Sequence, residues 1–302
     1  MLIHHNDSLP VITVIIPTLA EKARKHSLIR AISSIKMQQE VASEVIVLVN
    51  GNRFDSSLLS TLENRIDIRV IRIETASLVA ARYAGRAAVR TEFFSFLDDD
   101  DEYLPGSLKH RLDILRANAA CVMIVSSGYR ETGGKRTASA ANIDLALADP
   151  YGELAKNNWM TSCGGVYRSS KVPSHIFSDI PKYHEWTYLA YKILNIGKFC
   201  HTNRACYIIH DTKNSLSKTN SYHEANVAVL RKILKLNLPT KATRSVKERL
   251  ARAEHDLAGR ALALGLRGKA LRHNFRSIIL PGGFRYLMFS RKIFHKYRSP
   301  HL

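Results

Sequence analysis

The chain has little cysteine and no long apolar run, and we expect no signal peptide. Its 302 residues include four cysteines, none in a Cys-x-x-Cys pair, which argues against structural zinc and favours free thiols in a reducing compartment. No stretch of about 18 residues is apolar throughout, so we expect no segment to span a membrane. The N-terminus lacks the basic segment of a signal peptide, and its apolar run is typical of a strand. These absences predict a cytoplasmic protein.

Acidic residues are scarce in the last part of the chain. From Lys218 to Leu302 there are 19 Lys and Arg against 4 acidic residues, a net charge of +15, whereas the first 217 residues have a net charge of only +4. Apolar residues at helical spacing in this basic region predict a helix that packs on a neighbour. They are Val246, Leu250, Ala253, Leu257, Ala261 and Leu264. We therefore divide the chain into a domain at residues 1–217 and a basic, mostly helical region at residues 218–302.

The first hundred residues alternate between β-branched runs and helix-forming segments. Strands are predicted at residues 11–17, 44–49, 68–73 and 93–97, and helices at residues 27–38 and 77–90. This alternation predicts an α/β fold with an open, mostly parallel sheet. Because ligands of such sheets bind at the carboxyl ends of the strands, Thr18, Asn50 and residues 98–101 are candidate site residues.

The acidic run Asp98-Asp99-Asp100-Asp101 directly follows the fourth predicted strand. Four adjacent carboxylates repel one another, so the arrangement needs a compensating cation. Mg²⁺ and Mn²⁺ prefer such oxygen ligands, and Mg²⁺ is commonly shared with substrate phosphates. The run therefore predicts a metal-assisted enzyme that acts on a phosphorylated donor. A solvated acidic turn is the alternative.

An ordered set of motifs resembles those of glycosyltransferase family 2, whose members have the GT-A fold. The motifs are Val14-Ile15-Ile16-Pro17-Thr18, Glu44-Val45-Ile46-Val47 with Asn50-Gly51, residues 77–85, residues 96–101 with Leu104-Pro105-Gly106, residues 164–168, and His210 with Ser215 and Ser217. They cover residues 10–217 in the family's order and spacing. One such motif would be weak evidence, whereas the ordered set is specific.

The resemblance implies a nucleotide-sugar site. Thr18 matches a position that contacts the nucleotide base, and Asn50 stands where many relatives have an aspartate that accepts a hydrogen bond from uracil. A turn-forming role is the alternative for Asn50. Arg82 matches an arginine near the diphosphate, with a surface arginine as the alternative. The implied binding residues are Pro17, Thr18, Asn50, Arg82, Asp98, Asp99, Gly164 and Gly165.

The resemblance also implies a bound metal ion, either Mg²⁺ or Mn²⁺. Asp100 lies five residues before Pro105, as the metal-binding aspartate does in relatives. His210 would complete the metal shell, because neutral imidazole is a competent ligand. A structural histidine is the alternative at this position.

The general base is implied to lie in the segment Tyr183-His184-Glu185-Trp186, which opens a predicted helix. Relatives usually have a Glu-Asp pair here, and its aspartate is the base. Alignment on Trp186 places Glu185 at the base position, and its longer arm must still reach the acceptor hydroxyl. His184 ranks second as the base, and a glutamate that only favours the helix start is the alternative.

The implied reaction is sugar transfer with inversion from a nucleoside-diphosphate donor, such as a UDP-sugar, to a hydroxyl of a glycan or lipid-linked acceptor. A catalytically silent member that binds nucleotide or glycan is one alternative. A nucleic-acid-binding protein that acts through the basic region is another.

The basic region is predicted to contact an anionic membrane surface from the cytoplasmic side. Aromatic and basic side chains interleave at residues 284–294, a pattern that suits the surface of an anionic bilayer. Relatives that act on lipid-linked or envelope acceptors favour the same interpretation. We expect no nucleic-acid partner, and a merely solvated basic helix is the remaining alternative.

Overall fold

The computed structural model describes residues 9–139, 143–211 and 220–294, and its chain forms two compact units. One comprises Met1–Pro150 with Asn157–Lys213, and the other comprises Tyr151–Lys156 with Asn214–Leu302. The boundary predicted at residue 217 falls within residues 212–219, outside the described ranges. Tyr151–Lys156, which the sequence division assigned to the first domain, groups with the second unit because Leu154 is fully buried and its carbonyl accepts from Arg249 at 2.6 Å.

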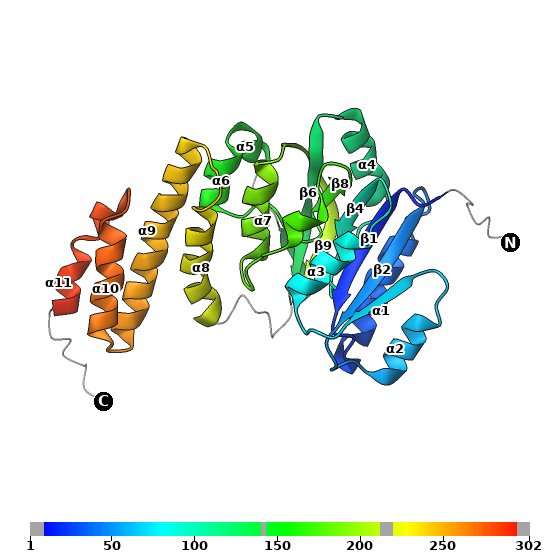
Figure 1. Cartoon of the computed structure of the whole chain (residues 1–302), viewed down its shortest axis with the longest axis horizontal. Coiled ribbons are helices and arrows are strands. Elements are labelled where there is room, and N and C mark those ends of the chain that lie inside the picture. Colours follow the sequence, from blue (N-terminus) through cyan, green and yellow to red (C-terminus); the bar gives the residue numbers. More distant parts are fainter. Residues whose placement is uncertain (1–8, 140–142, 212–219, 295–302) are drawn as a thin grey trace. The chain divides into compact units, whose positions relative to one another are not determined.

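The first unit is built on one mixed sheet (Figure 1). Its strands are β1 (Ile12–Thr18), β2 (Ser43–Asn50), β3 (Arg69–Ile73), β4 (Phe93–Phe96), β5 (Glu102–Tyr103), β6 (Cys121–Thr132), β7 (Lys135–Ala138), β8 (Gly165–Arg168) and β9 (Lys198–His210). The order is β3-β2-β1-β4-β8-β6-β9-β5, with β7 paired to β6. The four predicted strands, β1 to β4, are confirmed and pair in parallel. β8 then runs antiparallel to both β4 and β6.

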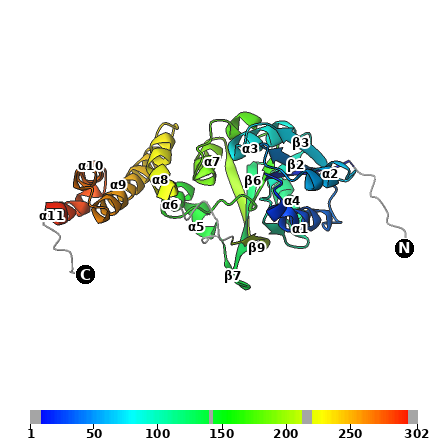
Figure 2. The same cartoon turned by 90° about the horizontal axis from the view of Figure 1, so that it is seen from below.

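Helices cover both faces of this sheet. They are α1 (Lys25–Lys36), α2 (Ser56–Glu63), α3 (Leu78–Ala87), α4 (Ser107–Ala117), α5 (Ile143–Ala148) and α7 (Glu185–Leu194), with short 3₁₀ turns η1 (Lys22–Arg24) and η2 (Ser174–Phe177). The predicted helices at 27–38 and 77–90 are α1 and α3. Figure 2 shows α3 on one side of the strands and α1 with α4 on the other.

Strand alternation explains this layering. Val14 and Ile16 belong to the buried core cluster that includes α1, α2 and α4. Ile15 points the other way, where its Cγ2 would lie only 2.5 Å from a Cβ added at Gly85 of α3. A strand buried on both faces requires such a continuous apolar run. The close approach of α3 to β1 holds Arg82, one turn earlier on α3, near the carboxyl ends of the strands.

The second unit is helical. It contains α6 (Pro150–Lys156), α8 (Asn220–Ile233), α9 (Thr240–Ala263), α10 (Arg267–Ile278), η4 (Gly283–Tyr286) and α11 (Phe289–Phe294). The predicted apolar spacing lies on α9, where Val246, Leu250, Ala253 and Ala261 are buried. Leu264 is an exception, because α9 ends at Ala263 and the Leu264 side chain is 75% exposed. Among the described residues, no helix combines the length and the apolar character needed to cross a bilayer.

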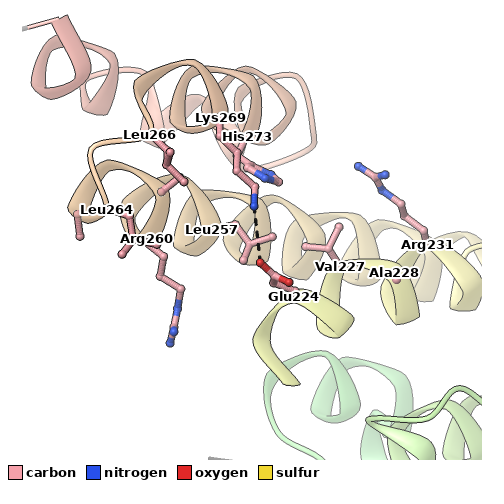
Figure 3. A pocket seen from close by; sticks show the side chains of 12 residues that line it. Glu224, Val227, Ala228, Arg231, Leu257, Arg260, Leu264, Leu266, Lys269 and His273 are labelled. Carbon is pink, nitrogen blue, oxygen red and sulfur yellow. Dashed lines mark ion pairs between the residues drawn. The ribbon is translucent and has the colours of Figure 1, made fainter. Parts of the chain in front are cut away.

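A pocket of about 520 Å³ lies between α8, α9 and α10 (Figure 3). Its charged groups are largely paired within the unit. Lys269 Nζ lies 3.7 Å from Glu224 Oε1 across the pocket, as the dashed line in Figure 3 shows. Arg231 and His273 both contact the buried carboxylate of Glu254, His273 at 2.6 Å. Most of the charged side chains that line the pocket are therefore paired within the second unit.

Candidate active site

Side chains from the ends of β1 and β2 meet the acidic run. The amide Nδ2 of Asn50 donates to the carbonyl of Thr18 at 2.9 Å. The Thr18 hydroxyl donates to Asp99 Oδ2 at 2.6 Å and accepts from the backbone N–H of Ala20 at 2.9 Å. Parallel strands end at the same edge of the sheet, which is why residues so distant in sequence come together. Pro17 lies just before Thr18, where the pairing of β1 with β4 has already ended at Ile15.

Each of the other aspartates of the run has a different partner. Asp98 Oδ2 accepts from the Ser162 hydroxyl at 2.7 Å, and Asp100 Oδ2 accepts from Arg24 Nη1 at 2.6 Å. Asp101 is buried and its Oδ1 accepts from the backbone N–H of His210 at 3.1 Å. A solvated acidic turn is therefore wrong. Part of the compensating positive charge that the run needs comes from the chain's own arginines.

Burial changes the acidity of the run. It raises the pKa of Asp99 to about 6, against the opposing effects of the Thr18 hydrogen bond and the charge of Arg24. The pKa of Asp101 also rises well above its usual value, through burial first and then through the nearby charges of Asp98 and Asp100. Buried carboxyl groups resist ionisation in this way because charge is poorly solvated there.

Arg82 is almost completely buried, so the alternative of a surface arginine is wrong. Its Nη2 lies 3.6 Å from Asp98 Oδ1 and its Nη1 lies 3.7 Å from Glu185 Oε1. The guanidinium also covers the ring of Trp186, with Cζ 4.9 Å from the ring centre. Its Nε and Nη1 have no hydrogen-bond partner although they are buried. Because such donors are costly to bury unpaired, the site suits an additional anionic ligand.

Glu185 is the first residue of α7, and it lies against Arg82 rather than in open solvent. Burial raises the pKa of Glu185, and the positive charge of Arg82 partly opposes this effect. His184 precedes the helix in a left-handed conformation with φ of 55°. A partly buried carboxylate with a raised pKa in a polar cluster is a suitable proton acceptor.

His210 ends β9 next to a different pair of carboxylates. Its Nε2 lies 3.0 Å from Glu102 Oε1, and its Nδ1 lies 3.6 Å from Glu131 Oε1. To bind a metal through one ring nitrogen, the imidazole would have to give up the carboxylate on that nitrogen, and its metal role stays a prediction. Ser215 and Ser217, which belong to the same motif, lie outside the described residues.

Gly164, just before β8, and Gly165, its first residue, have an internal packing role. A Cβ on Gly165 would clash with the hydroxyl of Tyr167, and one on Gly164 would lie 2.7 Å from Thr161 Oγ1. Their predicted role as a wall beside the sugar stays a prediction. The contacts alone explain why larger residues would not fit.

The acidic run has a donor set that fits a magnesium or manganese ion. In the part of the chain that the structure describes, no three His, Cys, Asp or Glu side chains could hold a metal by themselves. Mg²⁺ commonly uses only one or two protein carboxylates, with waters and substrate phosphates as the other ligands. The partly exposed carboxylates of Asp98 and Asp100 meet that need. Arg24 would share Asp100 with the ion.

Sequence reasoning missed four residues that contact the acidic run, one of them Cys163, whose Sγ donates to Asp101 Oδ2 at 3.6 Å. Arg24 pairs with Asp100, Arg30 donates to the Asp100 carbonyl at 2.6 Å, and Ser162 donates to Asp98. A signal for the arginines was present, since both follow the end of the first predicted strand. Ser162 had no such signal, because its place depends on the antiparallel insertion of β8.

The comparisons with known proteins agree with this geometry. The family model described as Glycosyl transferase family 2 matches residues 13–173, more than half of the chain. The crystal structure of S. aureus TarS 1–349 in complex with UDP-GlcNAc has a TM-score of 0.60 at 16% sequence identity, covering 88% of this chain and 80% of that chain. The structure of S. aureus TarS 1–349 has a TM-score of 0.61 at 14% identity, covering 95% of this chain and 93% of that chain.

At these identities the two structures show a shared fold and nothing finer. No curated protein matches the chain. The family match, together with an α/β sheet that gathers the acidic run, Thr18 and Arg82 at one edge, leads to one conclusion. The chain belongs to glycosyl transferase family 2 and has the GT-A fold.

Proposed function

We propose that this protein transfers a sugar, with inversion, from a nucleoside-diphosphate donor to a hydroxyl of a glycan or lipid-linked acceptor. The observation that carries the proposal is the position of Arg82. Its buried guanidinium lies within 3.7 Å of both Asp98, at the end of the acidic run, and Glu185, at the start of α7. A diphosphate and a general base are the two groups that inverting transfer must bring to one sugar.

Glu185 acts as the general base in this proposal. Its carboxylate takes the proton of the acceptor hydroxyl while that oxygen attacks the anomeric carbon opposite the leaving diphosphate. Burial raises its pKa, which makes the carboxylate a stronger proton acceptor than an exposed glutamate. The positive charge of Arg82 opposes this rise in pKa and favours the ionised form. His184 is the second candidate, and it differs from Glu185 in lying before the helix.

The diphosphate is held by the buried guanidinium of Arg82, whose Nε and Nη1 lack hydrogen-bond partners. Asp100, with Asp98 beside it, would hold the metal. When bound, Mg²⁺ or Mn²⁺ neutralises charge that develops on the leaving group. Thr18 and Asp99 lie at the same strand ends and would contact the nucleoside.

Asn50 is compatible with a uridine nucleotide as the donor. The Nδ2 of Asn50 already donates to the Thr18 carbonyl, so Oδ1 is the atom that would accept a hydrogen bond from the base. The imide N–H of uracil is a suitable donor for that atom. The crystal structure of TarS with UDP-GlcNAc makes UDP-GlcNAc the first donor to test.

The first experiment is a calorimetric titration of UDP, GDP and dTDP, each with and without Mn²⁺. We expect UDP to bind in a metal-dependent manner to the wild type and at least tenfold more weakly to Asp100→Ala. Asp113→Ala is the matched control, because Asp113 is exposed on α4 and its ion pair within the described residues is with Lys109. Absence of nucleotide binding under every condition would overturn the proposal.

Turnover separates an enzyme from a catalytically silent member of the family. With UDP-GlcNAc and Mn²⁺, slow release of UDP to water is expected even without an acceptor. Glu185→Gln should bind UDP as the wild type does and lose most of this release. Binding without any turnover for all donors would support the silent alternative instead.

A further inference from the structure

The end of the second unit exposes an unusual amount of apolar surface. Of the 17 large hydrophobic side chains exposed in the described residues, nine lie between residues 264 and 294. Single exposed apolar residues are normal on protein surfaces, whereas a concentration of them marks an interaction site. The packing of this unit therefore leaves a surface that is suited to a partner.

Helix α10 carries the ordered part of this surface. Leu271, Phe275 and Ile279 follow one another at steps of four residues and are 40%, 63% and 64% exposed. Residues four apart lie on one side of a helix, so they form a row along α10 and its C-cap. Arg272 and Arg276 each follow a member of the row. We call these five residues the α10 face.

The opposite side of α10 is anchored. Ala270, Asn274 and Ser277 are buried. The Ser277 hydroxyl donates to the Ala251 carbonyl of α9 at 2.7 Å, and Asn274 Nδ2 donates to the Ser290 hydroxyl at 2.8 Å. These contacts hold the inner side of α10 in place, and the α10 face on its opposite side is therefore left exposed.

The positive charge around the α10 face is not compensated. No acidic residue follows Asp256 in the sequence, whereas ten Lys and Arg do. Among the described residues from α8 to α11, the ion pairs between side chains involve α8, α9 and residues Lys269 and His273 of α10. Neither Arg272 nor Arg276 pairs with a described carboxylate. The α10 face therefore combines exposed apolar side chains with two arginines that have no described acidic partner.

We propose that the α10 face docks on an anionic lipid bilayer. The row of Leu271, Phe275 and Ile279 would enter the boundary between head groups and acyl chains, while Arg272 and Arg276 bind lipid phosphates. A second copy of the chain fits less well, because a symmetric contact would oppose like charges. Nucleic acid would use the arginines but leave the aliphatic Leu271 and Ile279 without a role.

The test is co-sedimentation of the full chain with vesicles of phosphatidylcholine alone or mixed with phosphatidylglycerol, at an ionic strength of about 0.15 M. One double variant, Phe275→Ser with Ile279→Ser, removes the apolar row. Another, Arg272→Gln with Arg276→Gln, removes the adjacent cations. Because Arg272, Phe275 and Ile279 are exposed and Arg276 is only half-buried, we expect both variants to fold, and thermal unfolding checks this.

Two control variants match these changes. Ile66→Ser removes an exposed apolar side chain from the first unit. Lys235→Gln with Lys247→Gln removes the same charge from exposed positions on and near α8 and α9. If the α10 face is the contact, these controls should keep the vesicle affinity of the wild type to within a fewfold.

We expect binding to anionic vesicles only, weakened about 30-fold by loss of the two arginines and at least tenfold by loss of the apolar row. Equal losses in the lysine control, or no loss with the apolar variant, would overturn the proposal. So would a dimer in light scattering that the apolar variant dissociates, or tighter binding to duplex DNA that only the arginine variant weakens. UDP titrations of the same variants should be unchanged, because this surface is independent of the donor site.

Discussion

Arg82 Nη1 lies 3.7 Å from Glu185 Oε1, and the same buried guanidinium reaches Asp98 through Nη2 at 3.6 Å. One side chain on α3 thus joins the acidic run after β4 to the start of α7. Because both carboxylates share its positive charge, we expect changes at Arg82 to alter donor binding and proton transfer together.

The activity should fall in acid because Glu185 must be ionised to act as a base. Burial raises the pKa of Glu185, so the acid limb of kcat/KM is expected above the value of about 4.3 for an ordinary glutamate. Glu185→Gln should lower kcat by about 10²- to 10⁴-fold and abolish this limb. His184→Gln, measured in the same profile, should retain it. Loss of the limb in His184→Gln alone would instead identify His184 as the base.

Replacing Arg82 should shift that limb further. The positive charge of Arg82 lowers the pKa of Glu185, so Arg82→Gln is expected to move the acid limb to higher pH and to weaken UDP binding at least tenfold. Arg82→Lys keeps the positive charge but loses the planar guanidinium. Its acid limb and its UDP affinity should therefore lie between those of the wild type and Arg82→Gln. Arg90→Gln, an exposed position just after α3, is the control and should change neither. An unchanged limb in Arg82→Gln would refute the coupling.

Asp99 should make the fold less stable as the pH rises. Its folded-state pKa is about 6 and its ordinary value is 3.8, so the folded state binds the proton more tightly. Stability therefore falls as the pH rises from about 4 to about 6. Asp99→Asn removes this effect and should be more stable than the wild type by roughly 1–3 kcal/mol above pH 6, with the gain disappearing near pH 4. Urea unfolding of the wild type and Asp99→Asn across this pH range tests the prediction. A difference in stability that stays constant with pH would contradict it.

The contact between α3 and β1 should tolerate no added methyl group. In Gly85→Ala the new Cβ would lie 2.5 Å from Ile15 Cγ2, and we expect a loss of about 1–3 kcal/mol in the free energy of unfolding. Gly259→Ala is the contrasting variant, because nothing lies within 4 Å of its Cβ on α9. It should gain up to about 1 kcal/mol from helix propensity. Denaturant unfolding of both variants and the wild type measures these changes in the free energy of unfolding.

Much of the α/β unit could be predicted because its signals are local. The β-branched runs of β1 and β2 and the small-residue pattern of α3 are properties of short segments, and the acidic run follows its strand directly in sequence. Other features depend on distant pairing. β8 inserts between β4 and β6 although it lies some 70 residues after β4. This insertion places Ser162 against Asp98, and no pattern near either residue indicated it.

The sequence by itself determined the class of fold, the candidate donor site and the uneven charge, because periodicity, motif order and composition are readable along the chain. Only the tertiary structure decided how charges are paired. It placed Arg24 and Arg82 against the aspartates, and it left His210 between Glu102 and Glu131 through the pairing of β5 and β6 with β9. It also showed that α10 buries Ala270 while exposing Phe275. Such pairings depend on which elements meet in space, and contacts between distant segments leave no local pattern.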